Sequence, residues 1–325
     1  MKSPYTSRIG VKVLCPNHFD TCMKCVPADS CSTANVWRRS WRRTPEIAGA
    51  FAGYPNAYDP PMELRGKRVL ITGASRGIGE SLAHSFADAG AVVALVARNQ
   101  DALEALAAAL GGTAHSADLS DPTQVAALVP RVEDEAGQID VLVNNAGIEN
   151  PGSFIDAPED EMRQVTQVNY LAPAELCRQA IPRMLRRGSG HIVNVSSMAG
   201  CSVAPGLVTY SASKAALSHF TAGLRADLRG LSIGTTLVEL GPIPTDMLAQ
   251  GYDYEPTGKA FQRAYRLRFM VDVPREKVSR EVVKAVQKGR RHVRLPKRGA
   301  FSPLLVEAPR RATEIMLTGI PHQAK

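Results

Sequence analysis

The sequence has no apolar run of eighteen residues, and this absence excludes a transmembrane helix of ordinary length. Its first residues lack a basic segment followed by an apolar one, so no secretory signal is expected. Six cysteines in 325 residues, four of them between positions 15 and 31, do not form the pattern of a disulfide framework. A cytoplasmic protein is therefore the expectation.

Charge is unevenly distributed along the chain, whose formal net charge is +8. Residues 1–61 carry 8 basic and 4 acidic side chains, residues 62–254 carry 14 and 21, and residues 255–325 carry 17 and 6. An acidic body thus lies between two basic ends. With 44% hydrophobic residues the chain can bury one large core or two modest ones.

Residues 1–61 show no helical or strand periodicity and are predicted to be a disordered basic extension. The alternative for part of this segment is a zinc site. Its members would be Cys15, His18, Cys22, Cys25 and Cys31. No second well-spaced pair completes that set, so we predict no metal. The Trp and Arg cluster at 37–43 is interpreted as a solvated tail rather than a nucleic-acid or lipid contact, because no folded platform accompanies it.

A glycine-rich turn follows the first predicted strand, at residues 68–72, and leads into a helix that extends to about residue 89. The turn reads Gly73-Ala-Ser-Arg-Gly77-Ile-Gly79. Glycines there let the backbone approach a pyrophosphate, and the start of the helix favours anions. Because this motif lies between a strand and a helix, it predicts a dinucleotide site.

The second strand, at residues 91–97, ends where an enzyme selective for NAD usually carries an acid that accepts from the ribose hydroxyl. This chain has Ala97 and then Arg98 there, and Arg76 projects from the glycine turn. Two guanidinium groups suit a 2′-phosphate, so NADP(H) is favoured over NAD(H). The alternative is that Arg98 is only a solvated charge at the end of a strand.

Strands and helices continue to alternate along the chain. Further strands are predicted at 113–117, 139–143, 191–195 and 233–240, with a helix at about 121–136. The third strand ends at Asp118-Leu119, a position suited to an adenine amine, and the fourth at Asn144-Asn-Ala-Gly147. This order predicts an α/β fold, a single doubly wound Rossmann-like domain with a parallel sheet covered on both faces.

Tyr210 and Lys214 lie four residues apart on a predicted helix, so both face the same side about one turn apart. A cation beside a phenol of ordinary pKa about 10 would bring that pKa toward the range of acid and base catalysis. Ser197 ends a buried strand thirteen residues before Tyr210, and its hydroxyl could donate to the same carbonyl oxygen. The alternative is a chance pair on a surface helix, since the chain has eight tyrosines.

A long helix is predicted at 159–187, with Asn169 and Pro173 marking a kink. With Asn169 and the motifs above in this order, the chain resembles the short-chain dehydrogenase/reductase family over about residues 64–250. The resemblance implies that Tyr210 is the general acid and base and that Ser197 positions the carbonyl. It also implies that Lys214 lowers the tyrosine pKa and binds ribose, and that Asn169 holds a relay water.

The same resemblance assigns the cofactor contacts. They are Gly73, Ser75, Arg76, Gly77, Ile78, Gly79, Arg98, Asp118, Leu119, Asn145, Ala146, Gly147, Tyr210, Lys214, Gly241, Ile243 and Thr245. The chain departs from the family after the strand at 233–240, where Leu240-Gly241 replaces the usual Pro-Gly and two extra prolines follow. Gly241 and Thr245 keep their spacing, so Ile243 is expected at the carboxamide and Thr245 at the pyrophosphate.

Residues of about 246–275 are expected to form a mobile substrate lid. The lid is rich in large apolar side chains, namely Tyr252, Tyr254, Phe261, Tyr265, Phe269 and Met270. These side chains favour a large apolar substrate, or they simply pack the lid down.

The carboxyl-terminal part begins with an amphipathic helix at 278–287 and a basic run at 290–296. The family commonly ends in a strand that supports a tetramer, and this chain is expected to carry a basic amphipathic tail at 296–325 instead. That tail either docks on the body with its charges solvated or lies on an anionic membrane near a lipid-like substrate. A homodimer through helices 159–187 and 207–229 is favoured.

The sequence therefore predicts a catalytic domain at 62–295 that interconverts a carbonyl and a secondary alcohol with NADP(H). The alternative is a dinucleotide-binding scaffold or sensor without catalysis, because a fold does not fix a function. Nucleic acid is not an expected partner. The substrate, the direction of reaction and the subunit count are outside what these residues determine.

Overall fold

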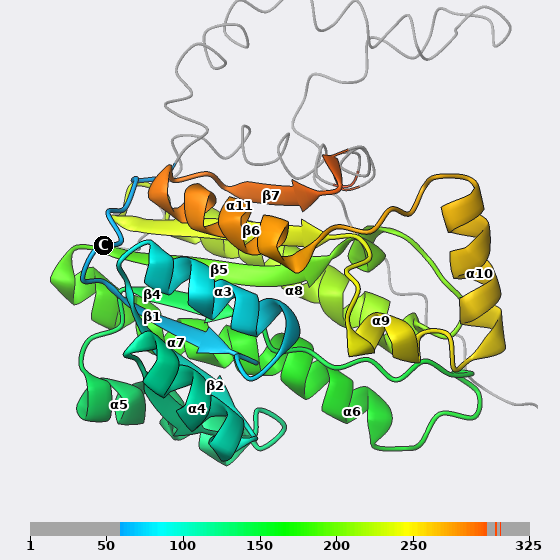
Figure 1. The fold of residues 1–325 in the computed structure, drawn as a ribbon, viewed down its shortest axis with the longest axis horizontal. Helices are drawn as coiled ribbons and strands as arrows, with labels where there is room; N and C mark the ends of the chain where they lie inside the picture. The colour runs from blue at the N-terminus through cyan, green and yellow to red at the C-terminus, as the bar shows by residue number, and fades with distance from the viewer. Residues whose placement is uncertain (1–58, 298–302, 304–305, 307–325) are drawn as a thin grey trace, which may run out of the picture. The chain divides into compact units, whose positions relative to one another are not determined.

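The computed structural model describes residues 59–297, 303 and 306, all of which belong to one compact unit spanning Asn56–Lys325. Seven parallel strands form one sheet in the order β3-β2-β1-β4-β5-β6-β7 (Figure 1). The strands are β1 (Arg68–Thr72), β2 (Val92–Ala97), β3 (Thr113–Ser116), β4 (Val141–Asn144), β5 (Gly190–Ser197), β6 (Ile233–Leu240) and β7 (His292–Leu295). The predicted doubly wound α/β fold is confirmed.

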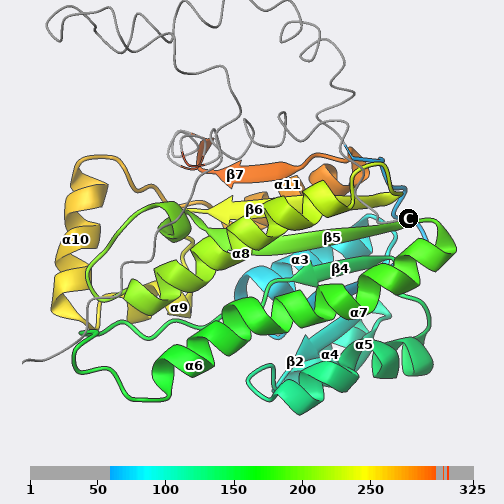
Figure 2. The same ribbon diagram turned by 180° about the vertical axis from the view of Figure 1, so that it is seen from behind.

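Helices connect the strands and cover both faces of the sheet. They are α3 (Gly77–Asp88), α4 (Gln100–Leu110), α5 (Pro122–Ala136), α6 (Glu161–Thr166), α7 (Ala172–Arg187), α8 (Val208–Asp227), α9 (Asp246–Gln250), α10 (Glu255–Arg266) and α11 (Arg275–Gln287). A face made by α3, α4 and α11 is seen in Figure 1, and one made by α5, α7 and α8 in Figure 2.

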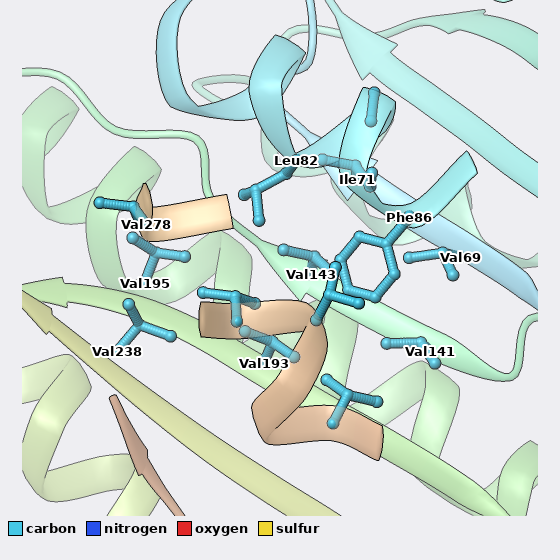
Figure 3. Packing of buried hydrophobic residues seen from close by; sticks show 14 of the residues in the cluster. Val69, Ile71, Leu82, Phe86, Val141, Val143, Val193, Val195, Val238 and Val278 are labelled. Carbon is cyan, nitrogen blue, oxygen red and sulfur yellow. The ribbon is translucent and has the colours of Figure 1, made fainter. Parts of the chain in front are cut away.

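The core consists of two apolar layers, one on each face of the sheet. In the first, Phe86 and Leu82 of α3 pack against Val69, Val141 and other strand residues (Figure 3). The second lies under α5 and α7. Strands buried on both faces favour apolar runs, and this explains why β1 and β4 show no alternation of polar and apolar residues.

All seven strands run in the same direction, so the loops that follow them gather at one edge of the sheet. Strand order reverses at β1, which has β2 on one side and β4 on the other. Ligands of open α/β sheets bind outside the carboxyl ends of the strands at such a switch point. Figures 1 and 2 both place α9 and α10 beyond this same edge.

No strand was predicted in the basic run at 290–296, but most of this run forms the seventh strand. Val293 and Leu295 are buried beside β6, while Arg294 Nε donates to Glu239 Oε2 over 2.6 Å. The charge of Arg294 is therefore balanced within the sheet. Of the tail predicted at 296–325, the structure describes only residues 296, 297, 303 and 306, and the rest lies outside the described residues.

The described residues begin at Asp59, three residues before the predicted domain start at residue 62, and Asp59 already belongs to the fold. Asp59 is 9% exposed, accepts from Thr235 N over 2.7 Å and pairs with Arg291 Nε over 2.7 Å. The predicted extension over 1–58, with its cysteine cluster, lies outside the described residues. Within the described part, no helix is both long and apolar enough to cross a membrane.

The long helix predicted at 159–187 is interrupted where the sequence indicated a kink. A π-helical turn, η1 (Gln167–Leu171), separates α6 from α7 and contains Asn169. Pro173 is the second residue of α7, directly after η1, and because the helix is continuous there its missing N–H leaves one helical hydrogen bond unmade. The π turn widens the helix at one residue and so directs Asn169 inward.

Candidate active site

The glycine turn after β1 has a backbone that side chains would obstruct. Gly73 and Gly77 have φ of 65° and 62°, a left-handed region that favours glycine. A Cβ on Gly79 would lie 2.0 Å from the Gly73 carbonyl oxygen, whereas one on Gly77 would meet only Thr245 Cγ2, at 3.7 Å. Gly79 thus closes the turn onto its helix, and Gly77 leaves room for a ligand.

The first turn of α3 differs from those of the next two helices. Asn99 caps α4 by accepting from Ala102 N over 3.1 Å, and Asp121 caps α5 by accepting from Thr123 N over 2.8 Å. Arg76, the N-cap of α3, makes no such hydrogen bond. The free N–H groups and the helix dipole at this end suit a phosphate, so the residues present fit a dinucleotide.

Thr72 ties the glycine turn to the loop after β4. Its hydroxyl accepts from Asn145 N over 3.0 Å and from Ala146 N over 3.1 Å. Asn145 Nδ2 in turn donates to the Thr72 carbonyl oxygen over 2.9 Å. The predicted Asn145 and Ala146 therefore brace the turn, and Thr72, which sequence reasoning missed, holds both.

Arg98, predicted to bind the 2′-phosphate, and Asp118, predicted to contact the adenine amine, lie near one another at the ends of β2 and β3. Arg98 is exposed, and its positive charge contributes to lowering the pKa of Asp118. The larger causes are hydrogen bonds from the Ser120 backbone and hydroxyl to that carboxylate. Arg76 contacts Asp246 Oδ2 at 3.0 Å, and both side chains of this ion pair are solvent-exposed.

The remaining predicted cofactor residues line the same edge with their backbones. Leu119 and Ile243 are 7% and 6% exposed, so both residues are largely buried at this edge. Thr245 Oγ1 donates to the Ile243 carbonyl oxygen over 3.2 Å. Gly241 N donates to Leu295 O over 2.7 Å, which shows how the altered loop after β6 is held. Ser75 and Ile78 are partly buried in the glycine turn.

Asn169 is fully buried and fixes the loop after Gly147. Its Oδ1 accepts from Ile148 N over 2.9 Å, and its Nδ2 donates to Ile148 O over 2.9 Å. The same Nδ2 lies 3.0 Å from Ser213 Oγ on α8. A Cβ on Gly147 would lie 3.2 Å from Lys214 Nζ and 3.3 Å from Asn169 Oδ1. The predicted Asn169, Gly147 and Lys214 thus converge.

Lys214 is 4% exposed, and its ammonium donates to Val195 O over 3.1 Å. It also lies 5.9 Å from the centre of the Tyr210 ring, as the spacing of four residues predicts. Burial lowers the pKa of Lys214 to about 8, and the charge of Glu149 opposes that change. The pKa of this lysine is therefore below that of an ordinary lysine.

Tyr210 and Ser197 interact, but the pKa of the phenol moves opposite to the expected direction. Burial raises the pKa of Tyr210, the charge of Glu149 raises it further, and a hydrogen bond with Ser197 lowers it. The pKa of Tyr210 is therefore raised and not lowered as expected, because burial and the charge of Glu149 have the largest effects on it. Ser197 Oγ donates to Leu240 O over 3.3 Å and must turn away to reach a substrate.

Glu149 is the charged group of this site that sequence reasoning missed. Burial raises the pKa of its carboxyl to about 7, and the charge of Lys214 acts against the increase. The signal in the sequence is an acid two residues after Gly147, next to the run of small and amide side chains. A carboxyl, an ammonium and a phenol thus influence one another beside the end of β4.

The predicted lid contains α9 and α10, and several of its aromatic residues pack within it. Tyr252 and Phe261 meet edge to face with ring centres 5.6 Å apart. A Cβ on Gly206 would lie 2.5 Å from Tyr254 Cδ1, so that ring covers the loop before α8. Phe269 is 76% exposed. The packing alternative therefore accounts for these three rings, and Phe269 is left facing solvent.

Comparisons with known proteins agree with this arrangement. A family model described as short chain dehydrogenase matches residues 67–255. A short chain dehydrogenase of Pseudocercospora fijiensis is 36% identical over 222 residues, which cover 66% of this chain and 72% of that relative. A fatty acyl-CoA reductase of Mycobacterium tuberculosis is 39% identical over 214 residues, covering 63% and 73%.

Solved structures of the same architecture include proteins with each form of the dinucleotide. A short chain dehydrogenase/reductase from Burkholderia phymatum in complex with NAD is 26% identical, with a TM-score of 0.66 over 81% of this chain and 99% of its own. A metagenomic short-chain oxidoreductase in complex with NADP is 28% identical, with a TM-score of 0.59 over 72% and 98%.

Proposed function

Because this chain belongs to the short-chain dehydrogenase family, we propose that it interconverts a carbonyl and a secondary alcohol, with NADP(H) as dinucleotide and Tyr210 as general acid and base. The coarser statement, an oxidoreductase that uses a nicotinamide dinucleotide, follows from the family. One observation supports the finer statement above all others. Asn169 and Lys214 converge on Gly147 beside Tyr210, at the edge where the glycine turn lies.

Each side chain has a task in this proposal. When bound, the nicotinamide supplies or accepts the hydride. Ser197 donates its hydroxyl to the carbonyl oxygen once it has left Leu240 O, and Tyr210 gives that oxygen its proton. Lys214 offers N–H donors to the ribose hydroxyls of the dinucleotide. Asn169 keeps the loop after β4 in place through its two bonds to Ile148 and, as in the family, holds a relay water.

The preference for NADP(H) rests on Arg98 and Arg76. No acid stands at Ala97 or Arg98 to accept from a ribose 2′-hydroxyl, and a guanidinium there binds a phosphate with charge-assisted hydrogen bonds. Arg76 would leave Asp246 to bind the phosphate. The Arg76–Asp246 ion pair is exposed, so it contributes little to stability and is easily replaced.

For the substrate we propose an apolar molecule that reaches Tyr210 beneath α10. The exposed Phe269 and the relative that reduces fatty acyl-CoA support this choice. We further propose a homodimer through α7 and α8, a cytoplasmic location, and no nucleic-acid partner. Contact of the basic tail with a membrane surface is retained as part of the proposal for a lipid-like substrate.

The test is NADPH oxidation against a panel of ketones, quinones, steroids and acyl thioesters, with Tyr210→Phe as the matched control. Turnover that requires the Tyr210 hydroxyl supports the enzyme. Tight NADPH binding with equal, negligible turnover by both proteins favours the alternative of a dinucleotide sensor. The raised pKa of the Tyr210 phenol is a further reason to test that alternative.

A further inference from the structure

We propose that the end of α10 docks on a membrane surface that carries anionic lipid. The docking surface is the segment 263–269, Arg-Ala-Tyr-Arg-Leu-Arg-Phe. It is separate from the basic tail at 296–325 and contains no residue assigned to the dinucleotide or to proton transfer. Docking does not require catalysis by Tyr210, so it goes beyond the proposed function.

Exposed apolar side chains are concentrated at one edge of the sheet. Among the described residues ten large hydrophobic side chains are exposed, and eight of them follow the carboxyl end of a strand: three after β4, two after β5 and three after β6. These eight are Phe154, Ile155, Met162, Val203, Val208, Tyr252, Leu267 and Phe269. Single exposed apolar residues are ordinary, whereas a concentration at one edge marks an interaction face.

The backbone at the end of α10 holds two of these side chains in solvent. Arg268 has a φ of 60°, and its N–H donates to Tyr265 O over 2.9 Å. The N–H of Phe269 donates to Ala264 O, also over 2.9 Å. These bonds form a Schellman motif, in which the residue at the Phe269 position commonly packs back on the helix. Here Phe269 is 76% exposed and Leu267 is 59% exposed, so neither side chain is used for packing.

The charge around these two side chains is positive. Arg263, Arg266 and Arg268 are exposed, and their guanidinium groups have no ion pair or hydrogen bond with any described residue. Between 256 and 271 the chain has four basic residues and no acidic one. Spacings of three and four residues place Arg263, Arg266 and Leu267 on one face of α10. A helix end of this polarity favours cations, which explains the arginines but not the exposed Leu267 and Phe269.

Apolar side chains among cations without an acidic partner match a lipid surface of negative charge. Arginines are attracted to anionic headgroups, and leucine and phenylalanine enter the boundary between headgroups and acyl chains. A second copy of the chain would bring like charge to the same place, so self-association through this segment is disfavoured. An acidic protein is the other occupant with the required charge, and the experiment separates it from lipid.

The other end of α10 is attached to the proposed active site. Thr257 Oγ1, in the first turn, donates to Pro205 O over 2.6 Å, in the loop that leads into the helix of Tyr210. From there α10 extends by about 18 Å over its twelve residues, beyond the carboxyl edge of the sheet (Figures 1 and 2). Docking by its far end would place a membrane on the side from which an apolar substrate is proposed to enter.

The experiment is cosedimentation of the full chain with vesicles of phosphatidylcholine alone or of equal parts phosphatidylcholine and phosphatidylserine. Arg263→Gln combined with Arg266→Gln should lower the partition coefficient on the anionic vesicles by about 25-fold, since each basic side chain at the surface contributes about fivefold. The matched control, Arg186→Gln with Lys288→Gln, removes two exposed charges where α7 and α11 end, at the opposite edge of the sheet. It should change the coefficient by less than about threefold, because that edge lies more than a Debye length from the lipid.

A third variant tests the apolar part of the contact. Phe269→Ser keeps every charge and should lower the partition coefficient by about fivefold, because the ring no longer enters the lipid. The basic ends of the chain are present in all variants, so their attraction to lipid cancels in these comparisons. An unchanged midpoint of urea unfolding shows that each variant is folded.

Three results would overturn docking by α10. Equal losses in the two double variants would mean that net charge alone draws the protein to lipid. Equal partition of wild type and Phe269→Ser would mean that no apolar contact forms. Weaker binding of Arg263→Gln with Arg266→Gln to soluble polyglutamate, without any difference on vesicles, would assign the segment to an acidic protein. Vesicle binding is measured without substrate, so none of these results depends on whether Tyr210 supports turnover.

Discussion

The proposed nucleotide side of the site, made by the loops after β1, β2 and β4, differs from the proposed proton-transfer side around α8 in the groups that it uses. On the nucleotide side the backbone supplies most of the groups that would contact the ligand, at Gly73, at Gly77 and at the uncapped start of α3. On the other side, side chains from β5, η1, α8 and the loop after β4 meet. A backbone cradle is encoded by neighbouring residues, whereas a side-chain cluster depends on several elements being packed correctly.

The largest expected effect tests the proton-transfer side by itself. Tyr210→Phe removes the acid and base, so kcat should fall by about 10²–10⁴-fold. The ring stays in place, and NADPH affinity should change by less than about threefold, because the glycine turn is untouched. Turnover assays and a titration of NADPH fluorescence measure the two quantities. A parallel loss of affinity would mean that the two sides are not separable.

The converse change tests the nucleotide side. In Gly79→Ala the new Cβ would lie 2.0 Å from Gly73 O, so the turn has to shift. We expect NADPH affinity to fall by more than about tenfold and the free energy of unfolding to fall by about 1–3 kcal/mol.

The matched control for that change is Gly223→Ala on α8, where no atom lies within 4 Å of the new Cβ. It should raise the free energy of unfolding by about 0.5–1 kcal/mol, because alanine favours a helix. Urea unfolding and calorimetric titration of both variants with NADPH give the comparison. Unimpaired binding by Gly79→Ala would show that the turn is not the cradle.

A smaller effect is expected at the outer end of the nucleotide side. Arg98→Ala should weaken NADPH binding by about tenfold and leave NADH binding within about twofold, since only the 2′-phosphate needs the guanidinium. Arg186→Ala, which removes an exposed arginine from the end of α7, controls for net charge. Dissociation constants for both dinucleotides measure the ratio. Equal losses for both forms would assign Arg98 no role in selection.

The smallest effect concerns the electrostatics of the proton-transfer side. The pKa of Glu149 is raised from 4.5 to about 7, so the folded state holds its proton more tightly than the unfolded chain. This contribution to stability is complete below about pH 4.5 and is lost as pH rises through about 7. Because the side chain keeps some exposure, we expect a change on the order of 1 kcal/mol.

The measurement for this effect is the difference between wild type and Glu149→Gln in urea unfolding at about pH 5 and about pH 8. Groups that titrate in both proteins, such as the buried His191, cancel in that difference. Glu149→Gln should lose less stability than wild type toward the higher pH. A pH-independent difference would mean that Glu149 is not buried as the structure has it.

Prediction from sequence succeeded where the determining interactions are local. Six of the seven strands and the glycine turn were expected, because buried parallel strands require apolar runs and tight turns require glycine. It did not predict β7, which lies in a basic run inside the predicted domain. Arg294 is compatible with a sheet edge only because Glu239 lies on the adjacent strand 55 residues earlier in the chain.

The sequence by itself determined the α/β architecture, the position of the dinucleotide turn and the pairing of Tyr210 with Lys214 on one helix face. These depend on periodicity and on spacings of a few residues, over which backbone geometry is known in advance. Only the tertiary structure decided the environment of that pair. The Tyr210 pKa depends on burial and on Glu149, which approaches from another element, and desolvation and through-space charge have no signature in local sequence.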